Sequence, residues 1–371
     1  MQTTGTTGTH SADAGRVEAA IQRLYADMAA VNLQPLWTQA AKLMPTHPQP
    51  RTQPWLWRWE TLRALAQRAG ELITIERGGE RRVLALANPG LDGLPFASST
   101  LWGAVQYLGP GESAPAHRHS PGAIRFVIQG DGVSTTVDGD ACDMHPGDLI
   151  LTPSWTWHDH RSEGDQPMIW FDGLDMPTVI ALDAVFYENF PDLMQPVTSR
   201  NSRTAGAGAV RSLGHSRDRP ADEPAKASPL IYRWADTDTT LAALLDEHGG
   251  PIASLEFVEP ATGGATLPTL GCEMHRLVPG DRTPTLRKAG SSVWVVYRGR
   301  GDTVVDGTRL RWRAGDMFVT PSWAAVDHRA EETSDLFAIS DRPVLEALGL
   351  YRDERLEAPQ VVTGDFAPAP A

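Results

Sequence analysis

Apolar residues recur at helical spacing through the first part of the chain. The stretch V-E-A-A-I-Q-R-L-Y-A-D-M-A-A-V follows Arg16 and precedes Pro35, and a shorter stretch after it ends at Pro45. A third stretch, W-R-W-E-T-L-R-A-L-A-Q-R-A-G, ends at Gly70, a residue type common just past a helix. Because this spacing places the apolar side chains on one helical face, the pattern predicts three helices.

The pattern then changes to short apolar runs separated by Gly, Pro and Asp. It does so from about Leu101 to Asp175, and again from Ile252 to about Pro343. Short strands at regular spacing are typical of a sandwich or barrel. We therefore predict a mainly β protein with two such units and an N-terminal helical segment. Two further helices are predicted, T-D-T-T-L-A-A-L-L-D-E-H-G-G before the second unit and V-L-E-A-L-G-L-Y-R after it.

Four histidines cluster in the first β unit. The segment G-E-S-A-P-A-H-R-H contains His117 and His119, and H-P-G-D-L-I-L-T-P-S-W-T-W-H-D-H contains His158 and His160. Residues i and i+2 of a strand point to the same face, so the first pair can reach one point. Neutral imidazole is the commonest side-chain ligand of divalent transition metals. The pattern predicts a metal site inside a barrel.

The spacing of these segments resembles the two cupin motifs. Gly111 is followed after five residues by His117, and Gly147 is followed after five residues by Pro153. His158 then lies five residues beyond that proline. A lone H-x-H is often an ordinary surface or core pair, but both motifs in order favour metal ligands.

The second β unit repeats the first. P-G-E-S-A-P-A-H-R-H aligns with P-G-D-R-T-P-T-L-R-K, and P-G-D-L-I-L-T-P-S-W aligns with A-G-D-M-F-V-T-P-S-W. Such self-similarity indicates a duplicated fold. The chain is therefore predicted to be a bicupin, with two cupin (jelly-roll) β-barrels.

The repeat also separates backbone positions from chemical ones. The turn glycines and prolines are kept in both copies, as expected of residues that shape the backbone. At the positions of the three histidines the second copy has Leu286, Lys288 and Val326. The second barrel is thus expected to be free of metal and to support folding and assembly, with a metal-free ligand pocket as the alternative.

The histidine that both copies keep has a different expected role. His328 stands opposite His160. Because His328 remains where every predicted ligand has been lost, His160 is not expected to be a primary ligand.

Composition shifts give the predicted domain boundaries. Residues 196–229 are rich in Pro, Gly, Ala and charge, which is typical of a linker. The predicted segments are a disordered tail (1–14), a helical and extended segment (15–95), the metal-binding cupin (96–195), the linker (196–229), the metal-free cupin (230–357) and a C-terminal tail (358–371).

Charge and targeting patterns restrict the partners. The net charge of −13 disfavours nucleic acid and anionic membranes. The start of the chain lacks a signal-peptide pattern, and no apolar run approaches the roughly 20 residues of a membrane span. Cys142 and Cys272 form no C-x-x-C motif, so we expect a reduced, cytoplasmic protein.

The residues around the predicted ligands favour an anionic substrate. The segment S-P-G-A-I-R-F-V-I-Q contains no carboxylate, so a divalent ion on three neutral histidines keeps its charge and has open positions. Fe(II) suits this arrangement, whereas zinc and manganese are not excluded by the ligands alone. Arg125, on the strand after the pair, is expected to bind a carboxylate. For Arg77 and Arg82 we favour solvation or pairing with acidic residues.

Many segments resemble one family of bicupins, the gentisate, salicylate and 1-hydroxy-2-naphthoate 1,2-dioxygenases. The resemblance covers nearly the whole chain. It is carried by P-L-W-T-Q, L-M-P-T-H-P, R-G-G-E-R-R, A-N-P-G, W-G-A-V-Q-Y-L-G-P, H-R-H-S, R-F-V, G-D-L-I-L-T-P, W-H-D-H, D-G-L-D-M-P and P-T-L-G-C-E-M-H-R-L.

The resemblance implies one non-haem Fe(II) per chain in the N-terminal cupin. It implies an aromatic hydroxy acid and O2 as substrates, cleavage of the ring between the carboxyl-bearing and hydroxyl-bearing carbons, and a homotetramer. The residues it assigns are the metal ligands His117, His119 and His158, the substrate-binding residues Arg81, Arg125, Trp102 and Gln106, and the proton-handling residues His160 and Asp172.

The resemblance leaves the substrate open. Gentisate, which would give maleylpyruvate, is favoured as the commonest family substrate, and the alternatives are salicylate, 5-substituted salicylates and 1-hydroxy-2-naphthoate. Small residues such as Val83, Gly103 and Ala104 are candidates for the choice. A bicupin that binds a metal without catalysis, or catalyses another reaction, is the alternative of a different class.

Overall fold

The protein is represented by a computed structural model that describes residues 8–73, 77, 82–206, 208–213 and 228–367. It divides into two units, residues 1–49 and 50–371. The first unit has α1 (Gly8–Ala30), η1 (Leu36–Thr38) and α2 (Ala40–Leu43). Residues 8–14, which the sequence assigned to a disordered tail, belong to α1.

The first barrel contains two six-stranded sheets. Their strand orders are β14-β8-β5-β10-β3-β2 and β11-β4-β9-β6-β7-β12. The strands are β2 (Val83–Ala85), β3 (Trp102–Leu108), β4 (Ser113–His119), β5 (Ala123–Gln129), β6 (Val133–Val137), β7 (Asp140–Met144), β8 (Leu149–Thr152), β9 (His158–Ser162), β10 (Met168–Leu174), β11 (Tyr187–Asn189), β12 (Ser199–Arg200) and β14 (Ile231–Tyr232).

The second barrel repeats this arrangement with an eight-stranded and a six-stranded sheet. The orders are β1-β22-β19-β24-β17-β15-β13, with β16 on β15, and β25-β18-β23-β20-β21-β26. The strands are β1 (Trp55–Trp57), β13 (Val210–Ser212), β15 (Ile252–Glu259), β16 (Gly264–Ala265), β17 (Gly271–Leu277), β18 (Leu286–Lys288), β19 (Ser292–Arg298), β20 (Arg300–Val305), β21 (Thr308–Arg313), β22 (Met317–Thr320), β23 (Ala325–Ala330), β24 (Ser334–Ser340), β25 (Asp353–Arg355) and β26 (Gly364–Asp365).

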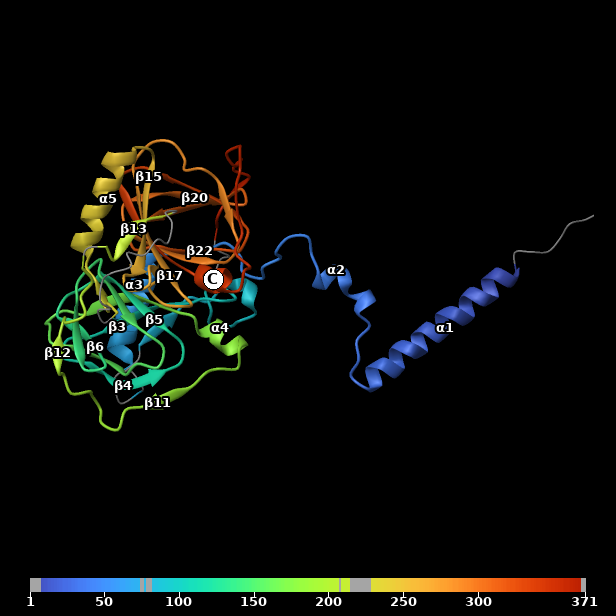
Figure 1. Cartoon of the computed structure of the whole chain (residues 1–371), viewed down its shortest axis with the longest axis horizontal. Coiled ribbons are helices and arrows are strands. Elements are labelled where there is room, and N and C mark those ends of the chain that lie inside the picture. The colour runs from blue at the N-terminus through green and yellow to red at the C-terminus, as the bar shows by residue number, and fades with distance from the viewer. Residues whose placement is uncertain (1–7, 74–76, 78–81, 207, 214–227, 368–371) are drawn as a thin grey trace, which may run out of the picture. The chain divides into compact units, whose positions relative to one another are not determined.

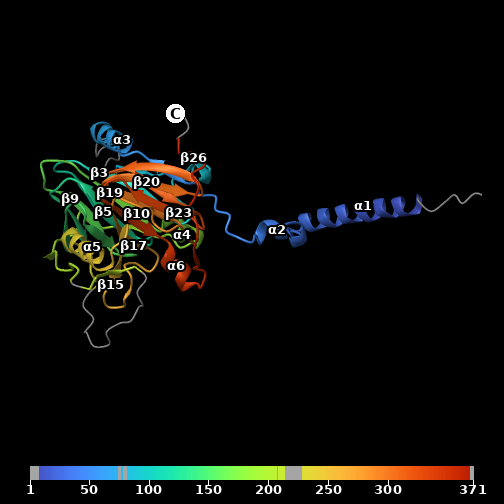
Figure 2. The same cartoon turned by 90° about the horizontal axis from the view of Figure 1, so that it is seen from above.

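The helices of residues 50–371 lie outside the sheets of the two barrels. α3 packs on β3 of the first barrel and α5 on β15 of the second (Figure 1; Figure 2). The predicted helices after Pro54, before the second unit and after it are confirmed. The helical segments are α3 (Trp59–Leu72), η4 (Pro89–Leu91), α4 (Met176–Ala181), α5 (Trp234–His248) and α6 (Arg342–Ala347).

The two halves of the chain exchange one strand each. β1 precedes the first barrel in the sequence but pairs with β22 of the second, and β14 precedes the second barrel but pairs with β8 of the first. The predicted linker contributes as well, because it contains β12, which pairs with β7, and β13, which pairs with β15. The barrels therefore share strands and are not independently closed.

A buried aspartate holds each exchanged strand. Asp316 accepts hydrogen bonds from the Trp59 backbone N–H and from Arg58 Nη1, both at 2.8 Å. Asp148 of the first barrel accepts the same pair, from Trp234 N–H at 2.9 Å and from Arg233. Each aspartate follows the glycine of a repeated G-D turn, so the repeat in the sequence also fixes these anchor points.

We expect the Asp316→Ala variant to lose about 3 kcal/mol of unfolding free energy. It leaves the Trp59 N–H without its acceptor and Arg58 Nη1 with only the Arg311 carbonyl, and the loss of a buried charged acceptor is costly. Chemical denaturation of the full chain measures this loss, with Asp353→Ala on the exposed strand β25 as the control. Equal midpoints for the two variants would contradict the anchoring role.

The interface between the barrels is aromatic and hydrogen-bonded. Phe126 of β5 stacks on Phe337 of β24, with ring centroids 4.3 Å apart and an interplanar angle of 4°. Thr100 donates a hydrogen bond to Asp341 at 2.5 Å, and the repeat places a matching contact between Thr269 and Asp175. In Figure 1 the first barrel is mainly green and the second mainly orange, and the two lie against each other.

Within the described residues, no helix has the length and hydropathy needed to cross a membrane.

Candidate metal centre

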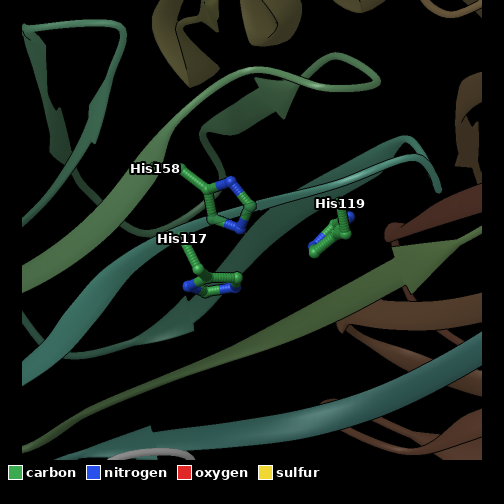
Figure 3. A group of neighbouring side chains, drawn as sticks. All are labelled: His117, His119 and His158. Atoms are coloured by element: carbon green, nitrogen blue, oxygen red, sulfur yellow. The ribbon is translucent and has the colours of Figure 1, made fainter. Parts of the chain in front are cut away.

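Three histidines from two neighbouring strands converge in the first barrel. His117 and His119 lie on β4, and His158 on β9 is the register partner of His117. A β-bulge between Ala114 and His117 adjusts the aim of β4 at this point. One nitrogen from each ring lies within 4.8 Å of the others, and Figure 3 shows the three imidazoles around a common space. The predicted ligand set is thus brought together.

Backbone carbonyls fix the tautomer of all three rings. His117 Nδ1 lies 2.9 Å from the Pro115 carbonyl, and His119 Nδ1 lies 2.8 Å from the Pro121 carbonyl. His158 Nδ1 lies 3.1 Å from the carbonyl of Thr156. A carbonyl only accepts hydrogen bonds, so each Nδ1 carries the proton and each Nε2 presents a lone pair. Metal-binding histidines are oriented in this way, so the residues fit a divalent ion.

Electrostatics also keep the ring of His158 neutral. Burial lowers the pKa of His158 well below its usual value, and the positive charge of Arg125 adds to the effect. A neutral ring is the form that binds a metal, since no proton has to be displaced.

The histidines open onto a cavity of about 170 Å³. Its polar lining includes five residues that the sequence singled out. They are Trp102 and Gln106 on β3, Arg125 on β5, His160 on β9 and Asp172 on β10.

A buried ion pair forms one wall of the cavity. Arg125 Nε lies 3.5 Å from Asp172 Oδ1, and the two residues are register partners across β5 and β10. Arg125 also donates to Thr152, and Trp170 donates to Asp172 at 3.0 Å. Burial raises the pKa of Asp172 to about 6, although Arg125 and Trp170 oppose this effect. Asp172 lies within β10.

His160 is oriented by a hydroxyl behind it. The Thr135 hydroxyl donates to Met144 Sδ at 3.1 Å, and its oxygen lies 2.8 Å from His160 Nδ1. In the tautomer in which this hydroxyl accepts from Nδ1–H, Nε2 of His160 is an acceptor toward the cavity. His328 has the same contact with Thr303, at 2.8 Å, as the repeat predicts.

The arginines of the R-G-G-E-R-R segment differ in their placement. Arg81 lies outside the described residues. Arg82 is buried in an ion pair with Glu112, and Arg77 donates to the backbone carbonyl of Leu72 at 3.4 Å. The predicted pairing of Arg82 with an acidic residue is therefore confirmed. Neither Arg82 nor Arg77 lines the cavity.

The small residues proposed for substrate choice also differ. Val83 lines the cavity, but Gly103 and Ala104 do not. A Cβ on Gly103 would meet Phe171 and Leu86, in the opposite face of the sheet.

Some residues of the site were not singled out from the sequence. Thr135 and Thr152 orient His160 and Arg125, and the ring of Tyr187 stacks on His117 with centroids 5.6 Å apart. Each threonine is separated in the sequence by at least two strands from the residue that it orients. Only the pairing of the strands therefore shows that Thr135 contacts His160 and that Thr152 contacts Arg125. Strand alternation was a usable signal for the apolar lining on the strands, which includes Ala114, Ala123 and Leu174.

Comparison with known proteins agrees with this site. A cupin domain matches residues 104–174. A gentisate 1,2-dioxygenase of Streptomyces sp. is 49% identical over 91% of this chain and 96% of its own. The chain belongs to the gentisate and salicylate 1,2-dioxygenase family. A 5-aminosalicylate 1,2-dioxygenase of Comamonas sp. is another relative, 39% identical over 93% of this chain and 94% of its own.

A solved member of the dioxygenase family has the same fold. The salicylate 1,2-dioxygenase from Pseudoaminobacter salicylatoxidans in its gentisate adduct is 40% identical over 96% of both chains, with a TM-score of 0.81. The predicted bicupin fold is therefore confirmed, and so is the prediction of a ring-cleaving dioxygenase, an oxidoreductase. A bicupin without catalysis is disfavoured by the same findings.

Proposed function

We propose that this dioxygenase opens the ring of gentisate to give maleylpyruvate. The observation that carries the proposal is one cavity lined both by the three-histidine group and by the buried guanidinium of Arg125. Such a cavity can hold the carboxylate and the neighbouring hydroxyl of one aromatic acid at the same time. In the reaction the bond between the two ring carbons that carry these groups breaks, and both atoms of O2 enter the product.

We propose that the metal is Fe(II), one ion per chain, bound by Nε2 of His117, His119 and His158. Three neutral ligands fit it because they leave the ion its full charge and open positions. When bound, Fe(II) supplies a place for the substrate oxygens and O2 and lowers the pKa of the substrate hydroxyl. The support from this chain is the fixed Nδ1–H tautomer of each ring.

Arg125 is the group that we propose for the substrate carboxylate. Its Nε is buried and has no hydrogen-bond partner among the described residues, since Asp172 Oδ1 stands 3.5 Å away. An unmatched guanidinium N–H is costly and gains a charge-assisted hydrogen bond when a carboxylate enters. Gln106 and Trp102 also line the cavity, where Gln106 contributes a polar amide and Trp102 a flat indole ring.

His160 and Asp172 are proposed to handle the proton of the substrate. With Nδ1–H held by Thr135, Nε2 of His160 accepts a proton from a hydroxyl in the cavity. Asp172 holds the guanidinium of Arg125 and accepts from Trp170, whose ring lies 5.3 Å from that of His160. A displacement of either residue therefore affects the other.

The size of the cavity favours a single-ring acid. Its volume of about 170 Å³ is below the roughly 300–1,000 Å³ common for drug-sized ligands. The relative of highest identity given above carries the name of a gentisate enzyme, and the solved neighbour binds gentisate. Salicylate and 5-substituted salicylates are the second candidates, and 1-hydroxy-2-naphthoate is the least favoured.

Oxygen uptake tests the proposed substrate. The protein is loaded anaerobically with Fe(II) and offered gentisate, salicylate, 5-aminosalicylate and 1-hydroxy-2-naphthoate in turn. We expect gentisate to give the highest kcat/KM and a product that contains both atoms of 18O2. A higher value for another acid would replace gentisate, and no uptake with any acid by iron-replete protein would overturn the proposal.

A second test uses pH. Because the pKa of Asp172 is raised to about 6, its carboxylate is protonated below that pH and ionised above it. If the ionised form positions Arg125, kcat/KM should fall about tenfold per unit as pH drops below this value. The Asp172→Asn variant should lack this acidic limb, whereas Asp165→Asn, on a turn between strands, should keep it. A limb unchanged in Asp172→Asn would assign it to another group.

The homotetramer implied by the family resemblance and the cytoplasmic location expected from the cysteines stay predictions.

A further inference from the structure

The second barrel contains a cavity of its own. It has a volume of about 260 Å³, which is larger than the cavity beside the three histidines. Leu286, Lys288 and Val326 line it, and these residues stand where the first barrel has its three histidines. The loss of the metal ligands has therefore not filled the barrel interior.

The replacement at the position of His119 brings a positive charge. Lys288 is at the end of β18, and its ammonium makes no hydrogen bond and no ion pair within 4 Å of the described residues. In the first barrel a divalent ion would bring positive charge to the corresponding place. The Lys288 ammonium is thus a covalently attached cation at the place where the first barrel would bind an exchangeable metal ion.

The other ionised groups of the cavity leave an excess of positive charge. Burial alone would raise the pKa of Glu273, but the charges of Lys288 and His275 outweigh it and lower this pKa to about 2. Glu273 is therefore ionised, and its Oε2 lies 3.1 Å from His275 Nε2. Lys288 and Arg355 both line the cavity, so two cations face one carboxylate even with His275 neutral. An anion is the ligand that balances this charge.

His275 also offers a donor to the cavity. Its Nδ1 lies 2.7 Å from the Ser254 hydroxyl, while Nε2 is buried without a well-aligned hydrogen-bond partner among the described residues, despite the nearby Glu273. His328, on the same lining, stays neutral because burial, followed by the charges of His275 and Lys288, lowers its pKa to about 3.

The cavity also has a flat, apolar wall beside His275 and His328, whose rings lie 5.0 and 4.8 Å from that of Trp294. Trp294 takes the place that Arg125 has in the first barrel, and its indole N–H donates to Thr320 at 3.0 Å. Phe318 stacks behind it with an interplanar angle of 4° and ring centroids 5.6 Å apart, so the indole is held in one orientation. A rigid indole face is suited to a flat ring.

We propose that the second barrel is a metal-free binding site for a small, flat monocarboxylic acid of one aromatic ring. The carboxylate pairs with the ammonium of Lys288, and the ring lies along Trp294 and against the neighbouring side chains of Leu286 and Val326. The site is separate from the proposed active site, because it lies in the other barrel and contains none of the three histidines. It binds its acid without chelation, so a hydroxyl next to the carboxylate is not required.

A heavy-atom acid locates the site directly. Crystals of the full-length, Fe(II)-loaded protein are soaked with 4-bromobenzoate, which has no neighbouring hydroxyl for chelation. We expect an anomalous bromine signal inside the second barrel, with the carboxylate at Lys288. Bromine found only in the first barrel or on the surface would overturn the proposal.

Calorimetric titration of the same probe tests the charge in solution. The Lys288→Met variant should bind 4-bromobenzoate at this site at least about tenfold more weakly, because one charge-assisted contact is lost. Lys288→Arg should retain the affinity within about threefold, and Lys42→Met, in the exposed helix α2, should bind as the unaltered protein does. Equal affinity in Lys288→Met and Lys42→Met would overturn the proposal, even where bromine is seen in the crystal. If Lys288→Met does not fold, Lys288→Gln provides the same comparison.

Discussion

Replacement of His119 by alanine should remove both the metal and the activity. The chain then keeps only His117 and His158 as nitrogen ligands, and Nε2 of His119 is one of three atoms within 4.8 Å of one another. We expect iron to fall from about one ion per chain to near zero, and oxygen uptake with gentisate to fall more than about 10³-fold. Elemental analysis and an oxygen electrode measure the two quantities on the same sample.

A matched variant separates metal loss from general damage. His248→Ala changes an exposed histidine at the end of α5, near Glu247 and in the second half of the chain. It should keep its iron and its activity. The His119→Ala protein should also keep its circular dichroism spectrum, since this side chain is only partly buried. Iron-replete, active His119→Ala would contradict the ligand assignment.

The metal site could be predicted from the sequence because its signals are local. His117 and His119 lie two residues apart on one strand, and His158 follows a fixed interval after Pro153. The internal repeat added a comparison within one chain, since the second copy keeps the turns and lacks the ligands. The fold followed from the same repeat, because the strand pattern and the turn residues occur twice.

The exchanged strands could not be predicted in this way. β1 and β14 are short, and the segments W-L-W and I-Y do not indicate which barrel each strand joins. Their partners depend on buried contacts with Asp316 and Asp148, more than 80 residues away. The role of Thr135 was not predicted for a similar reason, because its contact with His160 exists only after β6 and β9 pair.

The second large effect is expected at Arg125. The Arg125→Met variant keeps the length of the side chain and removes its charge. We expect kcat/KM for gentisate to fall about 10²–10⁴-fold, as two charge-assisted contacts with the substrate carboxylate are each worth roughly 1.5–3 kcal/mol. Steady-state oxygen uptake at pH 7.5 measures this loss, and Arg161→Met, on an exposed position of β9, should lie within about twofold of the unaltered enzyme.

The variant also disturbs Asp172, and the two effects can be separated. Without Arg125, the buried Asp172 loses the charge that favours its ionised form, so its pKa should rise further above 6. The double variant Arg125→Met/Asp172→Asn removes this unpaired carboxylate and should recover stability in denaturant. If Arg125 binds the substrate, the double variant remains as slow as Arg125→Met because the carboxylate anchor is still absent. Recovery of kcat/KM together with stability would instead show that Arg125 only neutralises Asp172, and the substrate carboxylate would then need another partner in the cavity.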